Sequence, residues 1–318
     1  MSKQGKSQIG IGGYMEFERY TGREFHDSAL RFNLARTAVA FAVKAGGVKR
    51  VLLPRYLCSS IGEALLKEGI ASDYYRLKED MTPDIDKHPN SGECVFIVNY
   101  FGRFNNDELE AMRRLYGNIF IDNTQSFFQP PLCGVDTVYS CRKYFGVPDG
   151  AYLYTKNTEA YEKLPPDYSR ARLKHIFGRF EAGPEGYYQD FKRNELRLTE
   201  HGIRRMSELT QNMLKGIDYE IAMRKRSDNF NILDAALSDL NHLSVKNRAG
   251  LFMYPFMPDN PNETRLKLLA NKIYIPTLWP EVEEGFEPET GFAKNILPLP
   301  IDQRYGKEEM ERIIDILI

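Results

Sequence analysis

The first half of the chain alternates short apolar runs with amphipathic segments of about ten residues, and this alternation limits the folds available to it. Runs of β-branched and aromatic residues that are bounded by Gly, Pro or Asn are typical of buried strands. Such runs occupy residues 50–54, 72–77, 94–99, 119–121, 137–140 and 151–154. Segments with helical periodicity lie between them at residues 36–45, 59–68 and 106–116. Strands that alternate with helices form βα units. The pattern therefore predicts an α/β domain with a mainly parallel sheet.

The second half has a different pattern, which predicts a smaller α+β domain. Residues 157–200 are charged and rich in turn residues, so we expect surface helices and loops there. Apolar residues then recur at three- and four-residue steps from Met206 to Ile221, which predicts one long helix joining two domains. Further elements are expected as strands at 251–255 and 273–276 and helices at 263–271 and 307–318. We therefore predict an N-terminal arm (1–20) and a large domain within residues 1–205, followed by a small domain at 206–318.

Composition narrows the class of protein. The net charge is −1, and the Lys and Arg residues are scattered, which argues against nucleic acid or an anionic membrane as the partner. No apolar run approaches the ~20 residues that span a bilayer, and the N-terminus has no apolar core of a secretory signal. The four cysteines form no CxxC pair, and the five histidines have no metal-like spacing. We expect a reduced, cytoplasmic protein that lacks a metal site.

Two charged residues stand at the ends of neighbouring strand-like runs. Asp122 ends the run at 119–121, and Lys143 follows the run at 137–140. Ligands of α/β sheets bind outside the carboxyl ends of such strands. Alone, a lysine after a strand is most often a surface residue, and an Asp is often a turn or helix cap. Together they match pyridoxal 5′-phosphate (PLP) chemistry, in which a Lys forms a Schiff base with the aldehyde and an Asp pairs with the pyridinium nitrogen.

Four segments of the chain resemble the DegT-type family of fold type I PLP-dependent aminotransferases, which act mostly on nucleotide-linked keto sugars. The segments are residues 122–126 (DNTQS), 140–143 (SCRK), 33–38 (NLARTA) and 296–310, which ends in a strand-like LPLP run and a helix start. The resemblance covers most of the chain. It implies a large domain built on a sheet of the seven-stranded type, a smaller C-terminal domain, and a homodimer whose sites form at the subunit interface.

The resemblance also implies a role for each matching residue. Lys143 would be the Schiff-base lysine and proton carrier, and Asp122 would keep the pyridine nitrogen protonated. Gln125 would lie near the ring oxygen, where its amide can donate or accept. The residues expected to bind the cofactor phosphate are Ser140, Ala35, Arg36 and Thr37, the last three at a helix start that suits a dianion.

Two further residues are candidates for contact with the ring. Asn99 ends the run at 94–99 and could reach the ring hydroxyl. Tyr56 could stack on the pyridine face, although a buried core tyrosine is an equally good interpretation.

The implied function is an aminotransferase that moves an amino group from glutamate to a nucleotide-linked keto sugar in surface polysaccharide synthesis. Some positions depart from the family pattern. Ala35 replaces a glycine, residues 147–151 replace a glycine-rich run, and Asn194 is the one candidate for the asparagine that a partner subunit supplies. Another PLP reaction, such as dehydration or lyase chemistry, and a non-catalytic regulatory protein remain as alternatives. The presence of both Lys143 and Asp122 ranks transamination first.

Overall fold

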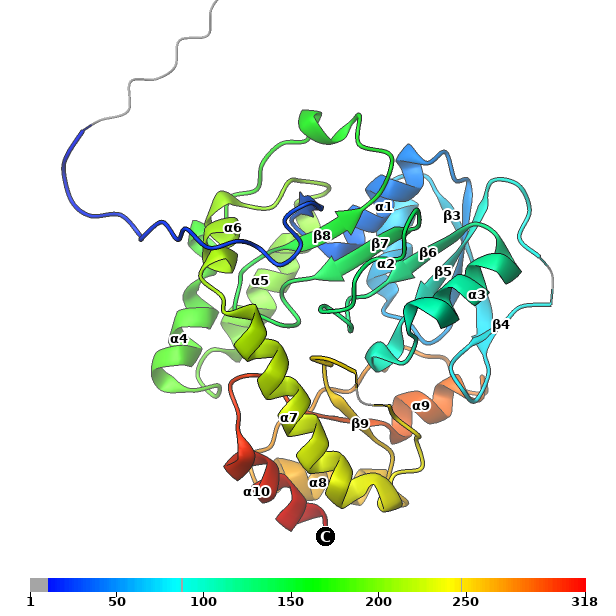
Figure 1. The fold of residues 1–318 in the computed structure, drawn as a ribbon, viewed down its shortest axis with the longest axis vertical. Coiled ribbons are helices and arrows are strands. Elements are labelled where there is room, and N and C mark those ends of the chain that lie inside the picture. The colour runs from blue at the N-terminus through cyan, green and yellow to red at the C-terminus, as the bar shows by residue number, and fades with distance from the viewer. Residues whose placement is uncertain (1–10, 87, 247) are drawn as a thin grey trace, which may run out of the picture.

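The computed structural model describes residues 11–86, 88–246 and 248–318. Its centre is an eight-stranded sheet with the order β1-β8-β7-β6-β5-β2-β3-β4 (Figure 1). The strands are β1 (Leu30–Phe32), β2 (Arg50–Pro54), β3 (Ala71–Leu77), β4 (Pro83–Asp84), β5 (Glu93–Val98), β6 (Ile119–Asp122), β7 (Asp136–Ser140) and β8 (Ala151–Tyr154). The six strand-like runs of the sequence are all strands of this sheet.

The sheet is mainly parallel, as expected. β3, β2, β5, β6 and β7 pair in parallel, while β8 is antiparallel to both of its neighbours, β7 and β1. β1 therefore points in the same direction as β7. β4 has only two residues and pairs antiparallel with β3, which adds an eighth strand to a sheet of the seven-stranded type. The carboxyl ends of β1, β2, β5, β6 and β7 consequently meet at one edge of the sheet.

Three helices follow strands of this sheet: α1 (Ala35–Ala45), α2 (Ser59–Lys67) and α3 (Asn106–Tyr116). α3 begins where the sequence predicts, because Asn105 and Glu108 form a capping box. The Asn105 side chain accepts from the Glu108 N–H at 2.8 Å, and the Glu108 carboxylate accepts from the Asn105 N–H at 2.7 Å. The core of this domain lies between the sheet and its helices and consists of buried aliphatic and aromatic residues from β2, β5, β6 and α1.

The small domain has its own core. It contains a two-stranded antiparallel sheet of β9 (Tyr254–Phe256) and β10 (Leu297–Leu299), with α8 (Pro261–Ala270), α9 (Glu289–Asn295) and α10 (Lys307–Leu317). The long helix α7 (Tyr219–Leu237) runs from the large domain into this region and packs against α10 (Figure 1). The expected helices at 263–271 and 307–318 are present within a residue or two of their predicted bounds.

Two predictions for this half of the chain are wrong. The helix from Met206 to Ile221 is broken into α6 (Glu208–Lys215) and α7, because Ser207 and Asp218 each cap a helix start and Gly216 ends the first helix. The strand expected at 273–276 is absent, since this extended segment pairs with no other strand among the described residues. The strand expected at 251–255 begins later, at Tyr254.

The remaining elements are short helices outside the large sheet. The charged segment forms α4 (Lys174–Ala182) and α5 (Tyr188–Glu200). Three-residue 3₁₀ helices occupy Tyr100–Gly102, Tyr161–Lys163, Arg170–Arg172 and Ser238–Leu240. Residues 1–10 of the predicted arm lie outside the described residues. The following residues are exposed and are attached to α6, where the Tyr20 N–H donates to Asn212 Oδ1 at 2.9 Å. Across the described part of the chain, no helix combines the length and apolarity that a membrane span needs.

Candidate active site

The predicted site residues gather at the carboxyl edge of the large sheet. β6 ends at Asp122 and β7 ends at Ser140, with Lys143 three residues further on. Asn99 directly follows β5. Tyr56 follows β2 by two residues. Because these strands are parallel neighbours, the fold brings to one edge residues that are far apart in sequence.

The start of α1 is brought to the same edge through β8. The register pairs Phe32 with Ala151 on one side and Ser140 with Ala151 on the other, so the ends of β1 and β7 lie level with each other. The Gly150 N–H also donates to the Asn33 carbonyl at 2.6 Å. α1 begins two residues after Asn33, and its first turn therefore lies near Ser140.

A chain of contacts links Lys143 to Asp122. Lys143 Nζ donates to Thr124 Oγ1 at 2.8 Å, and the Thr124 N–H donates to Asp122 Oδ1 at 2.8 Å. Burial among protein atoms lowers the pKa of Lys143, although the nearby charge of Asp122 opposes this effect. A lysine whose pKa is lowered has a larger fraction of neutral amine, which is the nucleophilic form.

Solvent reaches Lys143 through a pocket of about 690 Å³ between the two domains. Its walls come from the loop after β7, from α4 and α5, and from small-domain residues that include Phe252 and Gln303. Lys143 Nζ lies 5.8 Å from the centre of the Phe252 ring. Asp122 is buried behind Thr124 and is not a lining residue of this pocket. The pocket thus gives a small molecule access to the lysine amine.

Gln125 has a free donor in a buried position. The Phe101 N–H donates to its Oε1 at 2.7 Å, and Phe101 itself has a left-handed backbone with φ of 53°. Gln125 Nε2 is buried and has no hydrogen-bond partner among the described residues. A buried donor without an acceptor is costly, so this amide indicates a place where a bound oxygen atom would be stabilised.

The first turn of α1 has several unused donors. The residue before the helix is Leu34, which offers no side-chain cap to the N–H groups of Ala35, Arg36 and Thr37. The Thr37 hydroxyl lies 2.7 Å from Asn33 Oδ1 and 2.9 Å from the Leu34 carbonyl, so its proton is used within the turn. An uncapped helix start of this kind suits an anion.

Two predicted residues have their polar groups or ring faces occupied by the chain itself. The Asn99 amide N–H groups lie within 3.1 Å of three acceptors, the Phe104 carbonyl, Asn123 Oδ1 and Gln129 Oε1. Tyr56 stacks on Tyr100 at 5.4 Å between ring centres and meets the edge of Trp279 at 4.5 Å. Their contacts with a pyridine ring therefore stay predictions, and each residue also has a clear structural role.

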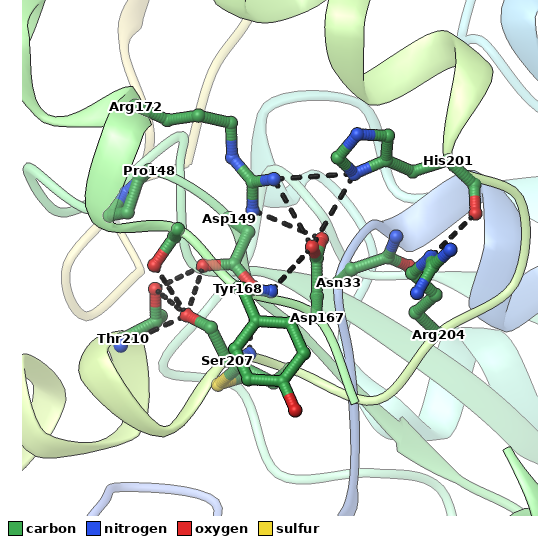
Figure 2. A network of polar contacts seen from close by, with 12 residues as sticks. Asn33, Pro148, Asp149, Asp167, Tyr168, Arg172, His201, Arg204, Ser207 and Thr210 are labelled. Carbon is green, nitrogen blue, oxygen red and sulfur yellow. Dashed lines mark hydrogen bonds and ion pairs between the residues drawn. The ribbon is translucent and has the colours of Figure 1, made fainter. Parts of the chain in front are cut away.

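A buried carboxylate fixes the segment after Lys143. Asp149 accepts from the Ser207 N–H at 2.9 Å, from the Ser207 hydroxyl at 2.8 Å and from the Thr210 hydroxyl (Figure 2). Burial raises the pKa of Asp149. These bonds tie residues 149–150 to the start of α6.

A second buried cluster holds the segment that lies beside Asn33. Arg172 pairs with Asp167 at 3.0 Å and lies 3.2 Å from His201 Nδ1 (Figure 2). The Asn33 N–H donates to the Arg204 carbonyl at 3.0 Å. Together the two clusters fix the backbone on both sides of the α1 start.

Sequence reasoning does not identify three residues of this region. Thr124, which contacts Lys143, lies within the segment 122–126, but the resemblance implies no role for it. Arg142 precedes Lys143 in the segment 140–143, where the resemblance implies no role for it, and in the structure it pairs with Glu195 of α5. Arg226 on α7 is fully buried, and a single arginine in a helix gives no indication of burial before the tertiary structure is known.

Comparisons with known proteins agree with this architecture. No protein-family model and no curated protein sequence matches the chain. Among solved structures, DesV from S. venezuelae is 18% identical with a TM-score of 0.66, over 91% of this chain and 83% of that one. A DegT DnrJ EryC1 StrS aminotransferase from Brucella abortus is 14% identical with a TM-score of 0.61, over 91% and 84%. Helicobacter pylori PseC, an aminotransferase involved in the biosynthesis of pseudoaminic acid, is 13% identical with a TM-score of 0.64, over 95% and 92%.

These similarities extend over most of the chain at low sequence identity, so they show its fold alone. The expected fold class is confirmed. The chain has the fold of the DegT/DnrJ/EryC1/StrS sugar aminotransferases, which are fold type I PLP enzymes.

Proposed function

We propose that this protein is a PLP-dependent aminotransferase that transfers an amino group from glutamate to a nucleotide-linked keto sugar in surface polysaccharide synthesis. The observation that carries the proposal is the contact chain from Lys143 through Thr124 to Asp122, placed at neighbouring strand ends beside an open pocket. Two other similar structures support the choice of ligands. One is described as the PLP form of Spr1654 from Streptococcus pneumoniae and the other as DesI in the presence of its TDP-sugar product.

The residues at the sheet edge fit PLP. Lys143 offers an amine of lowered pKa, and Asp122 offers a carboxylate for the ring nitrogen. The unpaired Gln125 amide would donate to the ring oxygen, and the uncapped start of α1 with Ser140 would take the phosphate. When bound, the cofactor supplies an electron sink that stabilises negative charge on the substrate carbon.

Lys143 would perform two tasks. Its amine would hold the cofactor covalently, and after the substrate amine has displaced it, the same amine would carry a proton between carbon atoms. The lowered pKa serves the second task, because it raises the fraction of neutral amine that can accept a proton. The Thr124 hydroxyl would hold the amine in place between these steps.

Asp122 would act on the cofactor ring without touching the substrate. Its Oδ1 is fixed by the Thr124 N–H, so the carboxylate has one defined orientation. A negative charge at this position would keep the ring nitrogen protonated. The aromatic and small-domain walls of the pocket would surround a substrate bound beside Lys143.

We also propose that the protein works as a homodimer in the cytoplasm. The described part of the N-terminal arm exposes Ile11, Tyr14 and Met15, whose side chains are large and apolar. Exposed apolar groups of this kind indicate a contact surface. A second copy of the chain would cover them.

The proposal is tested by absorbance spectroscopy of the purified protein with PLP. We expect a long-wavelength band, which glutamate should replace with a shorter-wavelength band and a keto sugar should restore. Lys143→Ala should abolish the long-wavelength band in the absence of added amine and lower kcat by at least about 10³-fold. Lys156→Ala is the matched control, since Lys156 is exposed just after β8.

Other outcomes would change the assignment. A band that persists in Lys143→Ala would contradict the role of Lys143. A band that is insensitive to glutamate, with sugar consumed in its presence, would indicate a different PLP reaction. If no band forms with the wild-type protein, the chain is not a PLP enzyme.

A further inference from the structure

We propose that Arg142, the residue before the lysine, binds the phosphate of the cofactor together with Arg36 and the start of α1. This inference rests on the proposed function and adds a charged phosphate ligand supplied by the same chain that carries Lys143. The family resemblance assigns no role to this position.

The first argument is the set of open donors around the end of β7. Ser140 is nine-tenths buried, and its hydroxyl makes no hydrogen bond to any described residue. The level ends of β7 and β1 place it beside the uncapped first turn of α1. Several neighbouring donors of this kind are stabilised when they share an acceptor with several oxygen atoms.

The second argument is the presence of two guanidinium groups at this place. The Arg36 guanidinium donates to the Thr199 hydroxyl at 3.3 Å, and no carboxylate of the described residues lies within ion-pair distance of it. The Arg142 side chain is 17% exposed and pairs with Glu195. Burial, followed by the nearby positive charge of Arg36, lowers the pKa of Arg142 to about 10. Their partners Glu195 and Thr199 lie one turn apart on α5, where the Thr199 hydroxyl donates to the Glu195 carbonyl at 3.0 Å. Two like charges at one face of a helix are stabilised by an anion between them.

The carboxylates near Arg142 leave room for an additional anion. Asp149 also acts on the charge of Arg142, but its oxygens already accept from Ser207 and Thr210. Glu195 is the one ion-pair partner of Arg142 among the described residues. A phosphate dianion offers more acceptor oxygens than these partners do, and the planar fork of arginine suits it.

The third argument is that α5 covers this place from within the same chain. α5 carries Glu195 and Thr199, which contact the two arginines, and Asn194, whose amide donates to the Pro148 carbonyl at 3.2 Å. Asn194 was the candidate for a residue supplied by a partner subunit. Here its amide contacts the loop after Lys143 of its own chain.

The test compares PLP with pyridoxal, which has the same ring and aldehyde but no phosphate. Each is titrated into purified full-length protein while the long-wavelength band is followed. We expect Arg142→Gln to weaken PLP binding by between about 10-fold and 100-fold, as for the loss of a hydrogen bond to a charged group, and to leave pyridoxal binding unchanged. Arg142→Lys should lose less, because it keeps the charge. Arg114→Gln, an exposed arginine on α3, should change neither.

Each outcome decides the question. The inference is overturned if Arg142→Gln affects neither aldehyde or weakens both equally while the protein remains folded. If Arg142→Gln fails to fold, Arg142→Lys decides by the same comparison of the two aldehydes. If the wild-type protein forms the band with neither aldehyde, the proposed function fails first and this inference falls with it.

Discussion

The edge of the large sheet and the junction between the two domains both contain buried hydrogen-bond donors. The two regions differ in whether those donors have partners. At the junction, Arg226 donates four hydrogen bonds. It donates to Gln303 Oε1 at 2.8 Å, to the carbonyls of Leu251 and Phe252 at 3.0 and 3.1 Å, and to the Tyr144 carbonyl at 3.3 Å. At the sheet edge, Gln125 Nε2 has no described partner.

This difference separates Arg226, whose contacts stabilise the fold, from Gln125, whose donor a ligand could satisfy. A buried donor with partners stabilises the fold, whereas one without partners costs free energy until something binds. Substitutions at the junction should therefore lower stability, and substitutions at the edge should lower activity. The four predictions below test that division.

The largest effect should come from Asp122→Asn. We expect kcat to fall by roughly 10²–10³-fold, because the charge opposite the ring nitrogen is lost. The Asn oxygen can still accept from the Thr124 N–H, so the thermal midpoint should hardly change. Steady-state kinetics and a thermal melt check both statements. A large drop in midpoint with normal kcat would place Asp122 among the structural residues.

Arg226→Met should show the converse behaviour. We expect a loss of about 3–5 kcal/mol in the free energy of unfolding, as for breaking a buried charged network. Burial already lowers the pKa of Arg226, so its contacts must offset a desolvation penalty. Urea unfolding measures the loss. Arg224→Met on the exposed side of α7 is the control and should stay within about 0.5 kcal/mol of wild type.

Protonation of His26 should make the free energy of unfolding depend on pH. Its Nε2 lies 2.8 Å from the Phe127 carbonyl, and burial lowers its pKa from 6.5 to about 4. The unfolded chain then binds more protons between these values, so stability is full above pH 6.5 and is lost as the pH falls toward 4. The loss should be at most about 3 kcal/mol. Unfolding free energies from pH 7 to 4.5 test this, and His26→Gln should remove that part of the slope.

Tyr56→Phe should have the smallest effect. The Tyr56 hydroxyl is buried without a described partner, so its removal should leave stability unchanged or raise it by up to about 1 kcal/mol. Its stacking partner provides the control, since the Tyr100 hydroxyl donates to the Tyr56 carbonyl at 2.6 Å. Tyr100→Phe should therefore lower stability by about 1 kcal/mol. A clear loss in Tyr56→Phe would mean that its hydroxyl has a partner in solution.

The sequence predicts the elements whose causes are local. The six strands and α3 have clear periodicity and turn residues, and Asn105 with Glu108 marks the start of α3 three residues apart. Asp122 and Lys143 could be located as candidates for the same reason, because Asp122 is the last residue of β6 and Lys143 lies three residues after β7.

Elements that depend on distant partners could not be predicted. β1 has three residues and exists through pairing with β8, some 120 positions away. The run from Met206 to Ile221 keeps helical periodicity across a break that two capping residues create. The contact of Thr124 with Lys143 and the burial of Arg226 likewise arise only when separate segments pack together.

The position of β8 between β7 and β1 bears on how the chain acquires its fold during synthesis. β1 leaves the ribosome early, but the strand that it pairs with follows only after residues 151–154 have emerged. Closing a loop of this length is entropically costly and slow compared with forming a local helix. The start of α1 can therefore take its place beside Ser140 only after β8 has been made, and a nascent fragment that ends before β8 would lack a completed place for an anion.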